Sequence, residues 1–569
     1  MKRTFIFTIS LLLCMLGIAA QNATVKGRIA DRVSDQPVAG VTVTLLGQQI
    51  NTLTNSAGEF QFVMVAAGDD EIRFSAEGYF PQIKTVKITE NQTNDLGKIV
   101  LIPDAQADAR QDILLQISES QLNDEGRTQV VSASTSSASD IYLSQTGYSF
   151  SPMRFRTRGY DNKYESTYIN GVHFLDAERG GFNYSSIGGM NNATKNKDMV
   201  YGLIPNTFAF GNIGANTNIN TRASSFATGS NANVALSNRS YKIRGQYTYG
   251  TGVLNNGWAF AISGIIRWSD DNKDALKLVE GTFYNSAGLF LSAEKIFNDK
   301  HSLSLVAFGA PTRRAGQAAI TKEARDLTGS IYYNPYWGYQ NDKVRNSRIY
   351  KTFDPTTVLS HDWKITNNQQ LRTGLGFHYS WYSNSTFAYN GMHPAPDYYR
   401  YMPSFTENDI TTHNKATSIW EKDQYMQQIK WGEIYRANKL NNDTLPEGQA
   451  AYALIRRHNN LMETSFNSIY TNSFNPNLKF TAGVEGRLSK GMHYQTIDDL
   501  LGANQVIDRD TYADRDLTTE TMQDVDPRFA ENDLNDKNKK KHEGDIWGYN
   551  YSMNVQTANA YAQIEYKYE

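Results

Sequence analysis

Hydrophobic and polar positions alternate with a period of two in many segments of the second half of the chain. The segment ANAYAQIEYKYE at 558–569 places Ile564 and Tyr566 on one side and Gln563 and Glu565 on the other. Successive side chains of a β-strand point to opposite faces, so this segment is predicted to be a strand with one apolar and one polar face. The apolar face needs a partner, which is either a protein core or lipid.

The same alternation recurs from about residue 225 onward. The segments at 241–250, 371–381 and 479–487 each place aromatic or aliphatic side chains on one face and polar or small side chains on the other. Alternating segments of about ten residues that end in aromatic residues are typical of transmembrane β-strands. The pattern predicts about ten such strands between 225 and 569.

The connections between these strands alternate between short and long. Short turns are predicted at 254–257, 298–300, 366–368 and 475–477, and long polar segments at roughly 310–350, 383–463 and 488–550. Bacterial barrels have short periplasmic turns and longer extracellular loops. We therefore expect 225–569 to be part of a transmembrane β-barrel, with the apolar face of its strands against lipid.

Composition agrees with a chain rich in β-structure. The 569 residues include 34 Tyr, 26 Phe, 8 Trp and 42 Gly but only 14 Pro, which favours strands over helices. A chain of this length contains more than one folding unit. The net charge of -2 gives no broad basic surface for nucleic acid. After the N-terminus, no apolar run approaches the ~18 residues of a transmembrane helix.

The first 20 residues have the features of a secretory signal peptide. Lys2 and Arg3 precede an apolar core, and small residues such as Ala19 and Ala20 follow it, so 1–20 is expected to be removed on export. The only cysteine, Cys14, lies inside this segment, and Leu13 before it argues against a lipoprotein site. The mature chain therefore has no cysteine for disulfides or thiolate chemistry.

Residues 22–103 are predicted to form a small β-sandwich. Short alternating segments such as ATVKGRIAD and GVTVTLLGQ are separated by turns, one of them at Gly58. The order VKGRI, GVTVT, TNSAGEF and FSAEGY resembles the carboxypeptidase regulatory-like domain, which is non-catalytic despite its name. A zinc-ligand pair is also lacking, because the first histidine after the signal peptide is His173. The polar segment at 104–122 is predicted to be a linker.

Three motifs between 123 and 224 point to a further domain. They are Arg158-Gly159 at the end of a strand, an Asn170-Gly171 turn, and Gly211 and Gly214 ahead of an Asn/Thr-rich strand. In this order they resemble the plug of TonB-dependent outer-membrane receptors, with Asn170 where that family usually has Asp. The alternative is that they are ordinary turns in a mixed α/β domain. The expected fold is thus mainly β, with a sandwich, a mixed α/β plug at 123–224 and a partial antiparallel barrel at 225–569.

The resemblance implies a bacterial outer-membrane receptor that imports a scarce nutrient by gating a plugged barrel. Its expected partners are the inner-membrane TonB energy-coupling complex, outer-membrane lipid and a small ligand, with the N-terminal sandwich in the periplasm. About ten strands cannot enclose a plug, whereas roughly twenty-two can. We therefore expect the chain to be C-terminally incomplete, with strand 558–569 at an open edge of the sheet.

Residues that carry chemistry are few. The nine histidines show no ligand spacing, the basic run KNKKKHEG at 537–544 is interpreted as a solvated loop, and no catalytic motif, metal site or cofactor site stands out. Two aromatic clusters in the outer segments contain Tyr336 with Trp337 and Tyr398 with Tyr399. They either stack on a ligand or pack the loops. The protein is not expected to be an enzyme.

Two other functions remain open. One is a glycan importer that pairs with a surface lipoprotein, and the other is a surface adhesin or structural barrel without transport. The substrate is open as well, since siderophore, haem, vitamin, peptide and glycan all fit the sequence. The TonB-docking segment shows no convincing signature.

Overall fold

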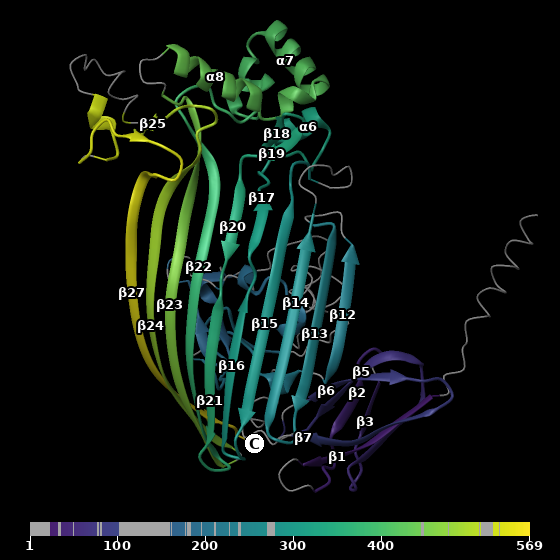
Figure 1. Cartoon of the computed structure of the whole chain (residues 1–569). Helices are drawn as coiled ribbons and strands as arrows, with labels where there is room; N and C mark the ends of the chain where they lie inside the picture. The colour runs from purple at the N-terminus through teal and green to yellow at the C-terminus, as the bar shows by residue number, and fades with distance from the viewer. Residues whose placement is uncertain are drawn as a thin grey trace, which may run out of the picture.

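A computed structural model describes residues 23–101 and 160–568, with gaps inside both ranges, of which 270–278 and 514–526 are the longest. The protein is mainly β. Three parts follow one another along the chain: an N-terminal pair of sheets, an inner domain, and a large curved sheet that ends in a helical cap (Figure 1). The signal peptide and the linker at 104–122 lie outside the described residues, as does the motif at Arg158-Gly159.

The N-terminal part is the predicted sandwich. One sheet has the order β4-β1-β7 and the other β3-β2-β5-β6. The strands are β1 (Ala23–Asp31), β2 (Thr42–Leu45), β3 (Ile50–Leu53), β4 (Glu59–Val65), β5 (Gly68–Ser75), β6 (Gln82–Ile88) and β7 (Thr93–Leu101). Alternate residues of both sheets fill one core around Phe60, Ile72 and Phe74. Gly58 has a φ of +74°, and a Cβ there would collide with the Ile29 carbonyl, so the predicted turn requires glycine.

The inner domain is built on a small sheet of order β10-β11-β8-β9. Its strands are β8 (Ser166–Ile169), β9 (Val172–Phe174), β10 (Lys197–Tyr201) and β11 (Ala215–Ile219). Asn170 and Gly171 connect β8 to β9 with φ values of 50° and 82°, the two left-handed positions of a type I′ turn. The helical elements described in this domain are 3-10 helices: η3 (Asn162–Tyr164), η4 (Tyr184–Ile187), η5 (Asn191–Ala193) and η6 (Ala223–Ser225).

The large sheet, called the wall from here on, is antiparallel and has the order β12-β13-β14-β15-β16-β21-β22-β23-β24-β27. These ten strands agree with the number that the alternation predicted. They are β12 (Gly229–Leu236), β13 (Ile243–Val253), β14 (Trp258–Trp268), β15 (Tyr284–Ile296), β16 (His301–Gly309), β21 (Thr356–Lys364), β22 (Gln369–Tyr389), β23 (Tyr452–Asn475), β24 (Leu478–Asp499) and β27 (Ile546–Tyr566). Two short strands, β17 (Thr312–Ala315) and β20 (Ile349–Phe353), extend it between β15 and β22.

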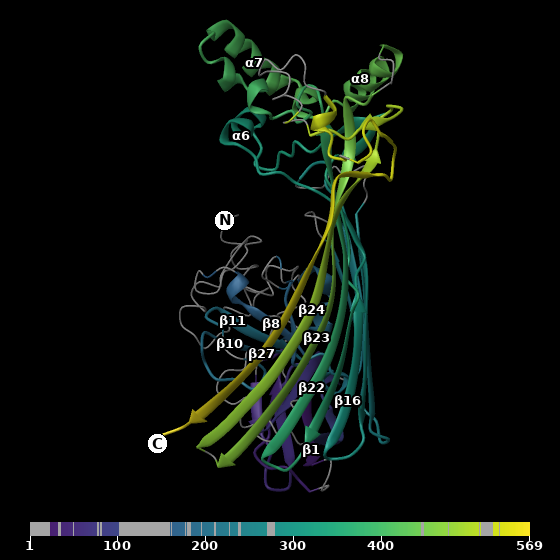
Figure 2. The same cartoon turned by 90° about the vertical axis from the view of Figure 1, so that its left-hand side faces the viewer.

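The wall curves around the inner domain (Figure 2). We call the face that contacts the inner domain the inner face and the opposite one the outer face. The predicted alternation separates the two: Leu375 on the outer face is 48% exposed, whereas Arg372 on the inner face is 7% exposed. On β27, Ile564 shares the outer face with its partner Phe480, so the apolar side of the chain's last strand points outward. Among the described residues, β12 and β27 do not pair with each other.

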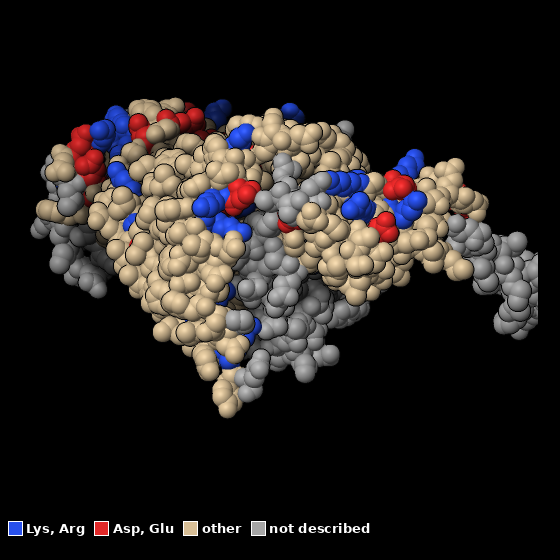
Figure 3. Space-filling model, turned by 90° about the horizontal axis from the view of Figure 1, so that it is seen from below, with Lys and Arg blue, Asp and Glu red and all other residues tan. Residues whose placement is uncertain are grey.

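The two ends of the wall differ as predicted. The turns between β13 and β14, β15 and β16, β21 and β22, and β23 and β24 are all short and lie at one end, the short-turn end. Seen from this end, most of the visible surface lacks charged side chains, and Lys, Arg, Asp and Glu gather in a few groups (Figure 3). The sandwich also lies here, where Thr85 Oγ1 on β6 donates to the Thr228 carbonyl beside β12 at 3.1 Å.

The long connections form a cap at the other end. Their predicted limits at 383 and 463 are wrong, because β22 continues to Tyr389 and β23 already begins at Tyr452. The cap also contains structure that alternation did not predict: α6 (Lys322–Thr328), α7 (Ile410–Lys422), α8 (Trp431–Thr444), the hairpin β18 (Trp337–Gln340) with β19 (Lys343–Asn346), and the pair β25 (Val506–Ile507) with β26 (Lys540–Lys541). No helix among the described residues has the length and apolar character that a membrane span needs.

Candidate functional site: the interface between the inner domain and the wall

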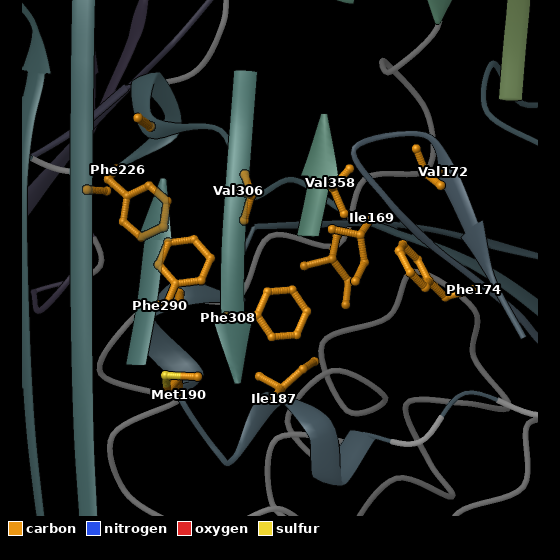
Figure 4. Packing of buried hydrophobic residues seen from close by; sticks show 14 of the residues in the cluster. Ile169, Val172, Phe174, Ile187, Met190, Phe226, Phe290, Val306, Phe308 and Val358 are labelled. Carbon is orange, nitrogen blue, oxygen red and sulfur yellow. The ribbon is translucent and has the colours of Figure 1, made fainter. Parts of the chain in front are cut away.

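One half of this interface is apolar. Phe174, Ile187 and Met190 of the inner domain share a buried cluster with wall side chains from β14, β15, β16 and β21. The rings of Phe290 and Phe308 contribute most of the wall side (Figure 4). Burial of such side chains contributes about 1.5–3 kcal/mol each, so this half holds the inner domain firmly to the wall.

The other half is polar and lies on strands β21 to β24. Arg222 of the inner domain forms an ion pair with Asp362 on β21. Arg372 on β22 donates from Nε to the other oxygen of the same carboxylate at 2.9 Å. All three side chains are at least 89% buried, with exposures of 5%, 11% and 8%. One carboxylate between two arginines links the inner domain to two neighbouring strands.

A second link joins β9 to β23 and β24. His173 Nδ1 lies 2.9 Å from Glu485 Oε1, and the His173 backbone N–H donates to Asn467 Oδ1 at 3.2 Å. The ring of Tyr168 stacks on His173 with centroids 4.6 Å apart. Burial, together with the negative charge of Glu485, raises the pKa of Tyr168 above its usual range. The phenol therefore stays neutral at physiological pH.

Further polar contacts lie on both sides of these two links. His493 Nε2 on β24 lies 2.7 Å from Glu178 Oε2 of the inner domain. On β15, Ser292 Oγ donates to the Thr221 carbonyl at 2.8 Å. Such contacts are specific, yet water can replace each of them if the surfaces separate. The interface thus combines an apolar half with a half that can be hydrated.

The predicted Asn170-Gly171 turn lies within this interface. Asn170 Oδ1 accepts from the Thr221 N–H at 2.8 Å, and the Gly171 N–H donates to Asn218 Oδ1 at 3.0 Å. A Cβ on Gly171 would lie 2.9 Å from Cδ of Arg372, one of the two arginines on Asp362. The turn therefore lies directly against one of the two arginines that bind Asp362.

The other predicted motif residues have separate places. Gly214 lies directly before β11, and a Cβ there would be 2.6 Å from the Tyr164 carbonyl oxygen, so glycine allows the close approach of two backbones. Gly211 lies outside the described residues.

The aromatic candidates lie in the cap and differ from one another. Trp337 is 4% exposed and packs inside the cap, so of the two predicted roles it has the packing of the loops. Tyr336 is half-buried, with the guanidinium of Arg348 5.2 Å from its ring centre. Tyr398 stacks on His393 at 4.3 Å, and Tyr399 is 56% exposed. Burial lowers the pKa of His393, so this imidazole is neutral at pH 7.

One residue that fixes the cap shows no sequence signal. Asn438 on α8 is fully buried. Its amide donates to the carbonyls of Tyr452, Leu500 and Leu501 at 2.8, 3.0 and 3.1 Å. Its oxygen accepts from the N–H groups of Ala451 and Tyr452 at 2.9 and 3.0 Å. A single side chain thus attaches α8 to the upper ends of β23 and β24.

Within the described ranges, no three or more His, Cys, Asp or Glu side chains gather in a way that would hold a metal ion. The polar groups of the interface are instead arranged to bond to one another. Their chemistry is recognition between two parts of one chain.

Comparison with known proteins identifies the first part of the chain. A family model of the carboxypeptidase regulatory-like domain matches residues 24–101, nearly the range that the sequence predicted. A comparison with curated proteins finds no match.

Three of the solved structures that match cover about 60% of this chain. The ferripyoverdine receptor of the outer membrane of Pseudomonas aeruginosa has 10% identity and a TM-score of 0.36, over 60% of this chain and 38% of that one. The unliganded ferric citrate transporter FecA has 8% identity and a TM-score of 0.36, over 59% and 40%. The copper transporter OprC has 11% identity and a TM-score of 0.37, over 60% and 41%.

A fourth match concerns the sandwich. A type II cohesin–X-dockerin complex from Acetivibrio cellulolyticus has 23% identity and a TM-score of 0.12, over 14% of this chain and 56% of that one. In all four cases the chain spans less than two thirds of the matched chain. Scores at this level do not decide the fold, which follows from the strand order and register described above.

Proposed function

We propose that this protein is a TonB-dependent outer-membrane receptor that imports a scarce solute through a plugged β-barrel. The observation that carries the proposal is the pairing of an apolar outer face with an inner face that binds a separate domain through contacts water can replace. Contacts that water can replace allow the two parts to separate at low cost, which a plug that moves requires.

The outer face supports the location in a membrane. Leu305, Leu359, Leu375 and Phe466 are cross-strand neighbours on β16, β21, β22 and β23, and each is 39–48% exposed. A continuous apolar row on the outside of an antiparallel wall fits lipid contact. The short-turn end would face the periplasm, and this orientation would also place the carboxypeptidase regulatory-like domain there.

The two halves of the interface suggest how the path would open. A pulling force from the inner-membrane TonB complex would separate the polar half first, because water replaces its lost hydrogen bonds. The apolar half would resist, since separating it exposes buried rings to water. The inner domain would then turn away from β23 and β24 while it stays attached to β14, β15 and β16.

The mature chain lacks cysteine, which permits a clean test. We would introduce Cys at His173 and Asn467, which already meet across the polar half where β9 lies against β23. Oxidation of the pair should abolish energised uptake and leave solute binding at the cell surface intact, and a reducing agent should restore uptake. Each single Cys variant serves as the control. Undiminished uptake by the oxidised pair would contradict movement of the inner domain against the wall.

Two alternatives are separated by further measurements. A glycan importer would co-purify with a surface lipoprotein from outer membranes. A non-transporting adhesin or structural barrel would leave growth of a deletion strain on every limiting solute unchanged. Solute-dependent growth that requires the chain and TonB supports the receptor.

A further inference from the structure

Above the inner domain, the inner face of the wall carries a row of residues that the polar interface does not use. The row is formed by directly paired residues of five neighbouring strands: Arg314 on β17, Tyr350 on β20, Asn384 on β22, Arg457 on β23 and Gln495 on β24. Directly paired residues of a sheet share a face, so all five side chains lie on one side of the wall.

The contacts of the inner domain identify that side. Arg457 is ten positions from Asn467 on β23, and Gln495 is ten positions from Glu485 on β24, and both lower residues bond to His173. An even separation along a strand keeps side chains on one face, so the row belongs to the inner face. Ten residues at about 3.4 Å each place Arg457 and Gln495 roughly 34 Å along the strands from these two contacts, toward the cap. On β24 the row lies two positions beyond His493, which contacts Glu178 of the inner domain.

A third arginine joins the row from the cap. Arg348 Nη2 donates to Thr386 Oγ1 at 3.2 Å, and Thr386 follows Asn384 on the same face of β22. The guanidinium of Arg348 also lies over Tyr336, the aromatic residue that the sequence analysis selected in this part of the chain.

The three arginines have spare hydrogen-bonding capacity. Arg457 is exposed, and Arg314 lies flat on the ring of Tyr350, 4.0 Å from its centre, which leaves the edge of the guanidinium to donate. None of Arg314, Arg348 and Arg457 forms an ion pair with a carboxylate of the described residues. Two carboxylates on this side of the wall have other partners, since Asp499 pairs with Arg345 at 2.6 Å and Glu178 with His493 at 2.7 Å.

The row also contains an amide whose oxygen has no hydrogen-bond partner among the described residues. The Oδ1 atom of Asn384, between Tyr350 and Arg457, is buried and has no hydrogen-bond partner in the part of the chain that the structure describes. A buried amide without a partner costs about 1–3 kcal/mol. This oxygen only accepts hydrogen bonds and is closed to solvent, so it does not hold an anion itself. The NH2 group of the same amide is the part of Asn384 that can donate to one.

We propose that this row is the binding site for an anionic solute, whose carboxylate, phosphate or sulfate groups are held by Arg314, Arg348 and Arg457. The planar guanidinium groups suit oxyanions, and Tyr336 and Tyr350 add flat apolar surface beside them. The proposal rests on the proposed function, because it names the class of solute that the receptor captures before the inner domain moves.

The wall supplies matched controls for this site. Arg313 is adjacent to Arg314 and points to the outer face, where its directly paired neighbour is Lys351. Replacement of Arg313 or Lys351 therefore removes the same charge from the same strands without changing the inner face.

The test measures binding of pyranine, a pyrene trisulfonate, to the full-length chain in detergent by fluorescence anisotropy, with uncharged pyrenemethanol as the comparison probe. Arg457→Gln and Arg314→Gln should each weaken binding of the trisulfonate roughly ten- to a hundredfold, the loss expected for one charge-assisted contact. Arg313→Gln and Lys351→Gln should change it less than about threefold at moderate salt, since charges on the far side are screened. Equal losses in both pairs of variants, or equally tight binding of pyrenemethanol, would overturn the proposal.

Two further measurements keep the test decisive. If a Gln variant does not fold, the salt dependence of the unaltered chain still tests the proposal. Its binding of the trisulfonate must weaken at least about tenfold between low and high salt. Binding in detergent needs no energy coupling, so the two proposals fail separately. Selective anion binding without uptake in cells contradicts the transport proposal alone, and uptake of uncharged solutes without anion binding contradicts this site alone.

Discussion

His173 Nδ1 and Glu485 Oε1 lie 2.9 Å apart, although 312 positions separate the two residues in the chain. The side chains are 10% and 8% exposed, so the pair is buried where β9 of the inner domain meets β24 of the wall. A contact of this kind belongs to neither part alone. It reports directly on whether the two are docked.

The first prediction concerns this pair. His173→Gln and Glu485→Gln should each loosen the inner domain, and the double variant should lose less than the sum of the two. The expected coupling energy is about 1–3 kcal/mol, the range for a buried hydrogen bond to a charged group. Urea unfolding followed through a fluorophore on the inner domain measures it. Strictly additive losses would mean that the pair does not hold the domain.

A second prediction concerns the type I′ turn. Gly171→Ala should destabilise the inner domain by more than about 1–2 kcal/mol, because it combines left-handed strain with a Cβ near Arg372. The control is Gly329→Ala after α6, where φ is +64° and nothing lies within 4 Å of a new Cβ. The control should lose only the stability that the left-handed backbone conformation costs an alanine. Equal effects in a thermal-unfolding assay would exclude a role for the contact.

The outer face provides a third prediction. Leu375→Arg puts a charge in the apolar row of the wall and should cost about 2–4 kcal/mol, as expected near the middle of a bilayer. Ile331→Arg in the cap changes a residue that is 63% exposed and should have little effect. The fraction of chain that resists denaturation in isolated outer membranes measures insertion. Normal insertion of the Leu375 variant would mean that this row does not contact lipid.

A fourth prediction is that residues 22–103 fold without the rest of the chain, since their two sheets enclose a core of their own. The isolated segment should unfold cooperatively when its circular dichroism is followed on heating. Phe74→Ala should destabilise it by about 3–5 kcal/mol, because Phe74 is completely buried. Leu53→Ala, at a position that is 63% exposed, is the matched control and should cost far less.

The fifth prediction concerns Asn438 in the cap. Asn438→Ala removes the hydrogen-bond partner of five backbone groups and should release α8 from the ends of β23 and β24. In Asn438→Asp, burial should keep the new carboxyl group protonated. It then keeps the two acceptor contacts and has one O–H donor in place of two N–H donors, so its effect should be intermediate. Hydrogen exchange of the α8 amides should rise in that order. Unchanged protection in the Ala variant would assign the attachment to other contacts.

Much of the wall could be predicted because its signal is local. Alternation assigned Leu375 and Arg372 to opposite faces, and the residue pair Asn170-Gly171 predicted a turn. Both signals depend on only a few adjacent residues. The helices of the cap were missed because they lie in polar segments where few apolar residues mark a face. The buried side of α8, for example, consists of Trp431, Ile434 and the polar Asn438. The pairing of His173 with Glu485 and the five contacts of Asn438 could not be predicted, because each depends on residues brought together only by the complete fold.

The strict alternation of the wall also limits how such a protein can change over evolutionary time. Loss or gain of one residue inside β22 would exchange the side chains of the outer and inner faces on one side of the change. The same event in the cap between β22 and β23 would alter only the length of a connection. Changes in length are therefore expected in the cap, whereas the wall should change almost entirely by substitution.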